Sequence, residues 1–350
     1  MQTFSSGTTI YAGVDALRAL KTLCGKRTLV VTDRFFSENG TAQKIAQLCG
    51  GDCRIFDRVE PDPPLSLIAD GISVLRDFRP DSIVALGGGS PIDCAKGILS
   101  LGGSEARLIA IPTTSGTGSE VTSFSIITHE GVKHPLVDAA LRPSAAILDP
   151  SLLQALPPKL IADAGMDVVS HCLEAIAAKN ASPFSDALAM SAFDTVRKLL
   201  PKSFSGDTSV REALHDAATM AGLAFDNAGL GACHALSHAI GGKFHLAHGR
   251  INAILLPHII TFNAEARPEP YRRLAAFCGL SGIRALTAAI VRLRAALKLP
   301  DTLTQAGLQS ENVLAAADEL CQAAQADPCS QGNPRPVTAA DYLALLRLCL

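Results

Sequence analysis

The chain has 350 residues, of which 48% are hydrophobic and 18% charged, and this length predicts two globular domains rather than one compact core. Its formal net charge of -2, with no run of basic residues, argues against nucleic acid or an anionic membrane as a partner. We expect a cytoplasmic protein with free thiols, because no stretch approaches ~20 consecutive apolar residues, no signal peptide is visible and the ten cysteines are scattered.

The first half of the chain alternates short β-branched runs with helical patterns. Strands are predicted at 27–33, 53–59, 82–86, 107–112 and 145–150, with helices over roughly 40–49 and 65–77. The segment EPDPP forms a rigid turn, because each proline restricts the residue before it. This alternation predicts a Rossmann-like α/β domain with a parallel sheet over residues 1–156.

The second half of the chain has a different sequence pattern. From about residue 159 onward, long Ala- and Leu-rich helical patterns replace the strand signals. The pair Pro157 and Pro158 marks the change. We therefore expect an all-α domain over residues 157–350.

A glycine-rich turn, LGGGSPIDCAKG, directly follows a predicted strand. Its three consecutive glycines allow positive φ and close approach of a ligand to the backbone: Gly87, Gly88 and Gly89. Ser90 suits an N-cap, Pro91 the first helical position, and Asp93 completes an S-x-x-D capping pattern. A helix N-terminus in this place predicts a phosphate site, and the alternative is a tight turn without a ligand.

Two further features suit a dinucleotide. Asp33 ends the first strong strand, where its carboxylate either binds a ribose 2′-OH, which favours NAD over NADP, or caps the next helix. The stretch IPTTSGTGSEVTS follows a later strand and either contacts a pyrophosphate or nicotinamide or forms a solvated loop. Its hydroxyls belong to Thr113, Thr114, Thr117 and Ser119.

A set of histidines and one aspartate has the composition of a metal site. Asp167 and His171 are four residues apart, so a helix would place them on one face. The later segment HALSHAIGGKFHLAH supplies His234, His238, His245 and His248. One carboxylate and three imidazoles complete the ligand set of a divalent transition metal and leave room for a substrate oxygen. The spacing leaves open which three of these histidines bind.

Four motifs in order carry a resemblance to a known family. GGGSPIDCAK, IPTTSGTGSEVTS, GMDVVSHCLEA and GLGACHALSHAIGGKFHLAHG resemble the iron-dependent (group III) alcohol dehydrogenases, and GNPRPVT extends the likeness toward the C-terminus. Within that family the last long motif is most similar to the 1-propanol dehydrogenases of bacterial propanediol-utilisation microcompartments. The resemblance implies the dehydroquinate synthase-like fold of these enzymes.

The resemblance also implies roles for individual residues. The metal ligands would be Asp167, His171, His234 and His248, with His238 acting as a non-ligand histidine near the substrate. The cofactor positions would be Asp33, Gly87, Gly88, Gly89, Ser90, Asp93, Thr113, Thr114, Thr117 and Lys133. Phe225 and Cys329 fall where the family lines its substrate pocket.

The activity implied is that of an NAD(H)-dependent alcohol dehydrogenase working mainly as a reductase of short aliphatic aldehydes such as propanal and acetaldehyde. Fe²⁺, with Zn²⁺ as an alternative, would polarise the carbonyl oxygen, and His238 would relay a proton. The family suggests a homodimer, and the microcompartment likeness suggests shell proteins as partners.

Two other functions are compatible with the same sequence. One is a hydroxyacid–oxoacid transhydrogenase of the same fold, which would need a cationic pocket for a carboxylate; only Arg250 lies beside the metal motifs. The other is a non-catalytic metal-binding scaffold.

Overall fold

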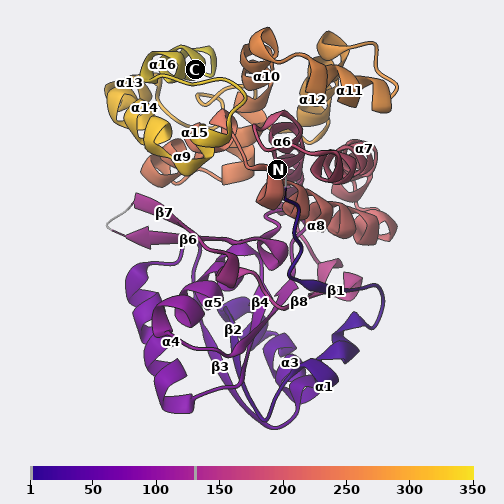
Figure 1. The fold of residues 1–350 in the computed structure, drawn as a ribbon, viewed down its shortest axis with the longest axis vertical. Coiled ribbons are helices and arrows are strands. Elements are labelled where there is room, and N and C mark those ends of the chain that lie inside the picture. The colour runs from indigo at the N-terminus through magenta and orange to yellow at the C-terminus, as the bar shows by residue number, and fades with distance from the viewer. Residues whose placement is uncertain (1–2, 130–131) are drawn as a thin grey trace. The chain divides into compact units, whose positions relative to one another are not determined.

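A computed structural model of the chain describes residues 3–129 and 132–350. The chain divides into two compact units, Ser6–Leu156 and Pro157–Leu350, the second of which includes the N-terminal residues up to Ser5. The described strands lie in the first unit, and the described regular structure of the second is helical (Figure 1). The predicted order of an α/β domain followed by an all-α domain is confirmed.

A six-stranded parallel sheet organises the first unit, in the order β1-β8-β5-β4-β2-β3. Its strands are β1 (Thr9–Ala12), β2 (Arg27–Asp33), β3 (Asp52–Val59), β4 (Ser82–Gly87), β5 (Arg107–Pro112) and β8 (Ala145–Leu148). The expected strands are all present. The edge strand β1 and an antiparallel hairpin, formed by β6 (Phe124–His129) and β7 (Val132–Val137), are additional.

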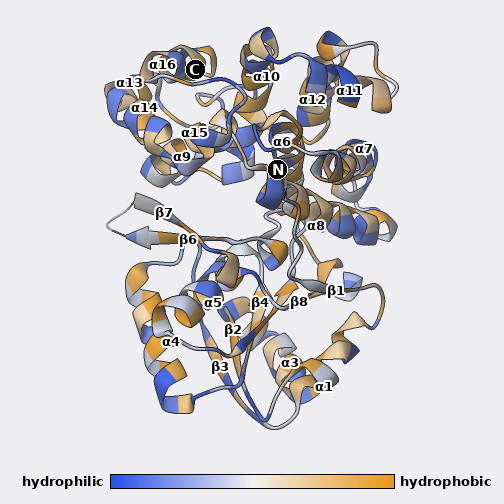
Figure 2. Cartoon of the chain, in the orientation of Figure 1, coloured by the Kyte–Doolittle hydropathy of each residue, from blue (hydrophilic) through white to orange (hydrophobic). Residues whose placement is uncertain are grey.

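Two hydrophobic cores cover the two faces of this sheet. Side chains alternate along each strand, so Leu29 and Val31 of β2 join one core while Val30 joins the other. The first core packs against α4 (Leu65–Phe78) and α5 (Gly89–Gly102), and the second against α1 (Leu20–Leu23) and α3 (Thr41–Cys49). Burial on both faces explains the nearly continuous apolar runs of the central strands, seen in Figure 2.

The helical unit is built around α6 (Pro158–Ala177), which is buried along almost its whole length from Ile161 onward. It packs against α7 (Pro183–Phe204), α8 (Arg211–Ala228) and α10 (His248–Ala266). The remaining helices are α9 (Ala232–Phe244), α11 (Glu269–Phe277), α12 (Ile283–Ala296), α13 (Ser310–Ala315), α14 (Ala317–Ala326), α15 (Pro328–Gly332) and α16 (Ala339–Leu348). A polar group on a helix this buried needs partners.

The structure also bears on two sequence expectations, the state of the cysteines and membrane-spanning helices. All ten cysteines are free thiols. Across 3–129 and 132–350, every helix is too short or too polar to cross a membrane.

Candidate active site

The glycine turn between β4 and α5 presents bare backbone. Gly87 has a φ of 148°, and a Cβ there would lie 2.4 Å from the ring of the proline four residues on, so only glycine fits. A Cβ at Gly88 would lie 3.2 Å from Thr114 Oγ1, and one at Gly89 would lie 2.9 Å from Thr117 Cγ2. The turn and the threonine loop therefore lie against each other at the N-terminus of α5, and a helix N-terminus is a place where backbone N–H groups bind phosphate.

The predicted cap of α5 is wrong. The helix begins at Gly89 with Gly88 as its N-cap residue and no capping side chain, so Ser90 and Pro91 lie within the first turn. Asp93 instead accepts hydrogen bonds from Ser119 Oγ at 2.5 Å and from the N–H of Ile126 at 3.2 Å. The helix therefore starts two residues earlier than predicted, and Asp93 ties α5 to Ser119 and to β6.

Two further predicted cofactor residues are Thr113 and Lys133. Thr113 is buried, and its N–H donates to the carbonyl of Gly87 at 2.9 Å. The side chain of Lys133, a predicted cofactor residue, lies outside the described part of the chain. The glycine turn and the threonines thus lie together, whereas the side chain of Lys133 cannot be placed with them.

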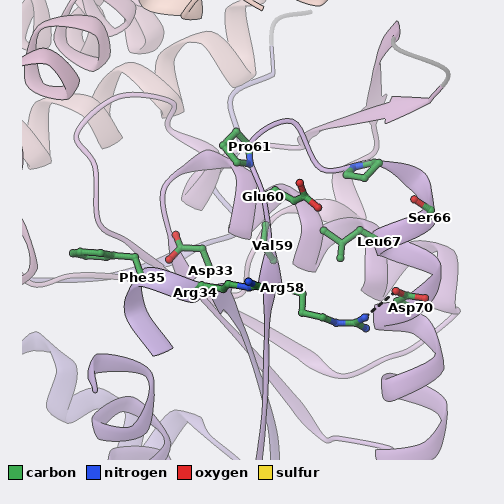
Figure 3. Close-up of a pocket in the computed structure, with 11 residues that line it drawn as sticks. Asp33, Arg34, Phe35, Arg58, Val59, Glu60, Pro61, Ser66, Leu67 and Asp70 are labelled. Carbon is green, nitrogen blue, oxygen red and sulfur yellow. Dashed lines mark ion pairs between the residues drawn. The ribbon is translucent and has the colours of Figure 1, made fainter. Parts of the chain in front are cut away.

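Asp33 caps a helix, which was one of the two roles predicted for it, and it also lines a cavity. It caps α2 (Arg34–Glu38), where its Oδ1 accepts a hydrogen bond from the N–H of Phe36 at 3.2 Å. It also lines a cavity of about 730 Å³ together with Arg34 and Arg58, the latter paired with Asp70 at 3.1 Å (Figure 3). Burial raises the pKa of the Asp33 carboxyl, although the helix N–H groups oppose this rise.

The second unit brings the proposed metal ligands together. Oδ1 of Asp167 lies 3.8 Å from Nε2 of His171, 3.6 Å from Nε2 of His234 and 3.4 Å from Nε2 of His248. Asp167 and His171 come from α6, His234 from α9 and His248 from the first turn of α10. Ligand atoms of Asp167, His234 and His248 lie within 4.8 Å of one another, and Nε2 of His171 approaches the same oxygen of Asp167 from outside that group.

Hydrogen bonds at Nδ1 orient most of the rings. Nδ1 of His234 contacts Oε2 of Glu174 at 2.7 Å, and Nδ1 of His248 contacts Oγ of Ser237 at 2.9 Å. Nδ1 of His171 is buried without a hydrogen-bond partner among the described residues, and its ring stacks on Phe225 at 4.3 Å. In both of these rings Nε2 faces Asp167, and Nδ2 of Asn252 lies 3.1 Å from Nε2 of His248.

The electrostatics of this cluster differ from ring to ring, since burial lowers the pKa of His171 to about 4. Burial tends to lower the pKa of His234, but the carboxylates of Asp167 and Glu174 raise it to about 9. Burial tends to raise the pKa of Asp167, and the surrounding imidazoles bring it well below its usual range. Two buried carboxylates thus create a negative field where the ring nitrogens converge, which suits a divalent cation.

A second group lies beside this cluster. Nδ1 of His238 contacts Oδ2 of Asp327 at 2.9 Å, and Asp327 also caps α15 by accepting from the N–H of Cys329 at 2.8 Å. These three residues place potential ligand atoms within 4.8 Å of one another. Burial raises the pKa of the Cys329 thiol well above its usual range, so this thiol is a poor metal ligand and a better apolar wall.

Comparison with known proteins identifies the family. The model for iron-containing alcohol dehydrogenases matches residues 7–150, and the model for the C-terminal domain of Fe-containing alcohol dehydrogenases matches residues 161–350. The chain belongs to the iron-containing alcohol dehydrogenases. It is an oxidoreductase.

Several members of this family are similar over nearly their whole length. The chain is 38% identical to 1-propanol dehydrogenase PduQ of Citrobacter freundii, covering 99% of both chains. It is 36% identical to the NADPH-dependent butanol dehydrogenase of Clostridium saccharobutylicum (96% and 94% covered) and 35% identical to the NAD-dependent methanol dehydrogenase of Bacillus methanolicus (94% and 93% covered).

A solved structure has the same fold. The iron-containing alcohol dehydrogenase of Thermococcus thioreducens is 31% identical, covers 99% of this chain and 98% of its own, and superposes with a TM-score of 0.93. The architecture described above is therefore that of the iron-containing alcohol dehydrogenases.

Three polar residues of the site were not predicted from the sequence. Glu174 follows His171 by three residues on α6, and Asn252 follows His248 by four on α10; the Nδ2 of Asn252 donates to Asp167 Oδ1 at 2.9 Å. Asp327 orients His238. The signal available for the first two was their helical spacing from a candidate ligand, three or four residues along, which places side chains on one face.

Proposed function

We propose that this protein is a metal-dependent, NAD(H)-dependent alcohol dehydrogenase that mainly reduces short aliphatic aldehydes, such as propanal and acetaldehyde, to primary alcohols. The observation that carries the proposal is the convergence of Nε2 atoms from three histidines around Oδ1 of Asp167. The proposed ligands are Asp167, His171, His234 and His248, and the proposed ion is Fe²⁺, with Zn²⁺ as the alternative.

The separations between these atoms fit such an ion. Two ligand atoms on a tetrahedral ion with bonds of about 2.1 Å are about 3.4 Å apart. The contacts of 3.4, 3.6 and 3.8 Å lie close to that value, and hydrogen bonding alone would bring the atoms closer. Imidazole and carboxylate are ligands that both Fe²⁺ and Zn²⁺ accept.

When bound, the ion would supply Lewis-acid polarisation of the carbonyl oxygen. His238 is the proposed proton relay: with its Nδ1 held by Asp327, its Nε2 remains available to give or take a proton. Phe225 and Cys329, both buried and apolar in character, are the proposed walls of the substrate pocket.

NAD(H) is the proposed cofactor, held at the turn of Gly87 to Gly89 and the threonine loop, with Asp33 facing the ribose. A carboxylate at this position repels a 2′-phosphate. The relatives include both an NAD-dependent and an NADPH-dependent enzyme, so the proposal rests on Asp33 itself.

The reductive direction, a cytoplasmic location within a microcompartment, shell proteins as partners and a homodimer are further parts of the proposal. They are supported by the likeness to 1-propanol dehydrogenase PduQ and to the family. Copurification with shell proteins from a shell-forming cell would support the location, and a purely soluble distribution in such a cell would contradict it.

A matched pair of histidine variants tests the metal site. His234→Ala should abolish metal retention and aldehyde reduction together, because it removes one ligand. His258→Ala, on the same helix as His248 but outside the ligand cluster, should leave both unchanged. Retention of both metal and activity by His234→Ala would refute the ligand assignment.

The transhydrogenase alternative is less well supported. It would need a cation to bind a substrate carboxylate, and Arg250 was the only candidate. Its guanidinium is engaged by both oxygens of Asp163, at 3.1 and 2.9 Å. A transhydrogenase would also show no turnover of free NADH, which the reductase must show.

A further inference from the structure

A buried carboxylate next to the proposed ligands accepts hydrogen bonds from one short segment. Glu174 of α6 is 4% exposed. Its Oε1 accepts from the N–H of Cys233 at 2.7 Å, and its Oε2 accepts from the N–H of Gly231 at 3.0 Å and contacts Nδ1 of His234 at 2.7 Å. Glu174 therefore caps the start of α9 from another helix and at the same time holds a proposed ligand.

The donors around this carboxylate determine its role. Backbone N–H groups can only donate, so both oxygens of Glu174 act as acceptors. A proton on Nδ1 of His234 complements the acceptor Oε2, and we take this nitrogen as the donor of the 2.7 Å contact. A neutral imidazole that carries its proton on Nδ1 has its lone pair on Nε2, which lies 3.6 Å from Oδ1 of Asp167.

The contact between Glu174 and the start of α9 depends on a glycine. A Cβ at Gly231 would lie 2.9 Å from Oε1 of Glu174 and 2.7 Å from Oδ1 of Asn333. Glycine at this position lets the start of α9 approach Glu174 closely enough for its N–H groups to bind. Among the three histidines proposed as ligands, His234 is the one whose Nδ1 contacts a carboxylate in the described part of the chain.

We propose that Glu174 is a positioning residue for the metal: it fixes the tautomer and aim of His234 and supplies a second negative charge beside the ion. This inference rests on the proposed function, since it takes the four ligands as given. Asp167 and Glu174 together offset the charge of a buried divalent cation, which Asp167 alone would leave uncompensated. Partners of this kind raise the basicity of a ligand imidazole, and losing one costs about 10–100-fold in metal affinity.

The test measures metal affinity directly. Metal-stripped wild type, Glu174→Gln and Asp186→Asn are titrated anaerobically with Zn²⁺ and Co²⁺ in competition with a chelator, and the visible absorption of the Co²⁺ forms is recorded. Asp186 is the matched control: it is a buried carboxylate of the same unit that pairs with Arg273 at 2.6 Å and contacts no proposed ligand. We expect Glu174→Gln to bind both ions about 10–100-fold more weakly and to alter the Co²⁺ spectrum, and Asp186→Asn to match wild type.

The melting temperature, measured beside Zn²⁺ affinity, separates positioning from helix capping. If Glu174 positions His234, Glu174→Gln should weaken Zn²⁺ binding by about 10–100-fold. A capping role alone would lower the melting temperature and leave the Zn²⁺ affinity of Glu174→Gln equal to that of wild type, which would overturn the inference.

Three other outcomes are decisive. If Glu174→Gln does not fold, Glu174→Asp keeps the charge but withdraws the carboxylate by one methylene, and unchanged Zn²⁺ affinity in that variant would overturn the inference, whereas weakened affinity would support it. If wild type itself binds neither ion, the proposed function fails and this inference falls with it. A wild type that binds, beside a Glu174→Gln that binds equally well, refutes the inference alone.

Discussion

Substitution of one glycine beside the proposed metal site should displace a proposed ligand. Gly249 follows His248 at the start of α10, where the chain passes close to the backbone of α6. A Cβ at this position would lie 1.9 Å from the carbonyl oxygen of Asp163 and 3.3 Å from Cβ of Asp167. Gly249→Ala must therefore push the first turn of α10 away from α6, and His248 moves with that turn.

The size of the displacement follows from the contact. The closest approach that a real Cβ tolerates is about 3.0 Å, so relief of the 1.9 Å contact needs a shift of roughly 1.1 Å. Metal–ligand distances are held within about 0.2 Å in genuine sites, so a shift of this size should remove His248 from the ligand set. Overpacking of this kind also costs about 1–3 kcal/mol, which lowers the melting temperature by roughly 2–12 °C in a unit of this size.

The assay compares metal content and thermal unfolding in two glycine variants. Gly241→Ala is the control, because its Cβ would meet Ile251 Cδ1 at 3.5 Å and Leu246 O at 3.6 Å, both ordinary contacts. We expect Gly241→Ala to retain metal and to be as stable as wild type or slightly more so, since alanine is the better helix former. A Gly249→Ala variant that binds one Zn²⁺ per chain with wild-type affinity would refute the reasoning.

Two further variants test the cofactor site and the C-terminal helix. Asp33→Asn keeps the acceptor that caps α2 but removes the charge, so the preference for NADH over NADPH, measured as the ratio of kcat/KM values, should fall by about tenfold or more; an unchanged ratio would count against Asp33 as the selectivity residue. Hydrogen bonds from Thr338 lower the pKa of Asp341, so its stabilisation is present above pH ~4 and lost as the pH falls through its folded value. Asp341→Asn should therefore melt below wild type at pH 7, with the gap closing in acid; a gap that is the same at both pH values would disprove this linkage.

Much of the α/β unit could be predicted because its strands are buried on both faces. The run RTLVVTD matches β2 (Arg27–Asp33) residue for residue, and RLIAIP matches β5. The edge strand β1 was missed because its four residues are mostly exposed and carry no apolar run. The start of α5 was misplaced because the glycines, rather than Ser90, set where the helix begins.

The metal site could be predicted from the sequence only in part. The spacing of Asp167 and His171 predicts a shared helix face, since that information is local. The approach of His234 and His248 to Asp167 depends on how α6, α9 and α10 pack, which no local pattern encodes. For those two residues the sequence alone left the choice among histidines open, and the resemblance to a family supplied it.

The supporting carboxylates were missed for the same reason. Glu174 is a charged residue on an almost wholly buried helix, yet nothing local indicates that it meets the start of α9, 57 residues away. Asp327 reaches His238 across 89 residues of sequence. Contacts of this range become visible only when the fold is known.

The most direct test of the proposed function is anaerobic oxidation of NADH with propanal by protein that has been stripped of metal and then reloaded with Fe²⁺ or Zn²⁺. We expect no turnover from the stripped protein, turnover restored by Fe²⁺, and none restored in His234→Ala. A reloaded wild type that binds either metal tightly and still fails to oxidise NADH would contradict the proposal that this protein is a metal-dependent aldehyde reductase.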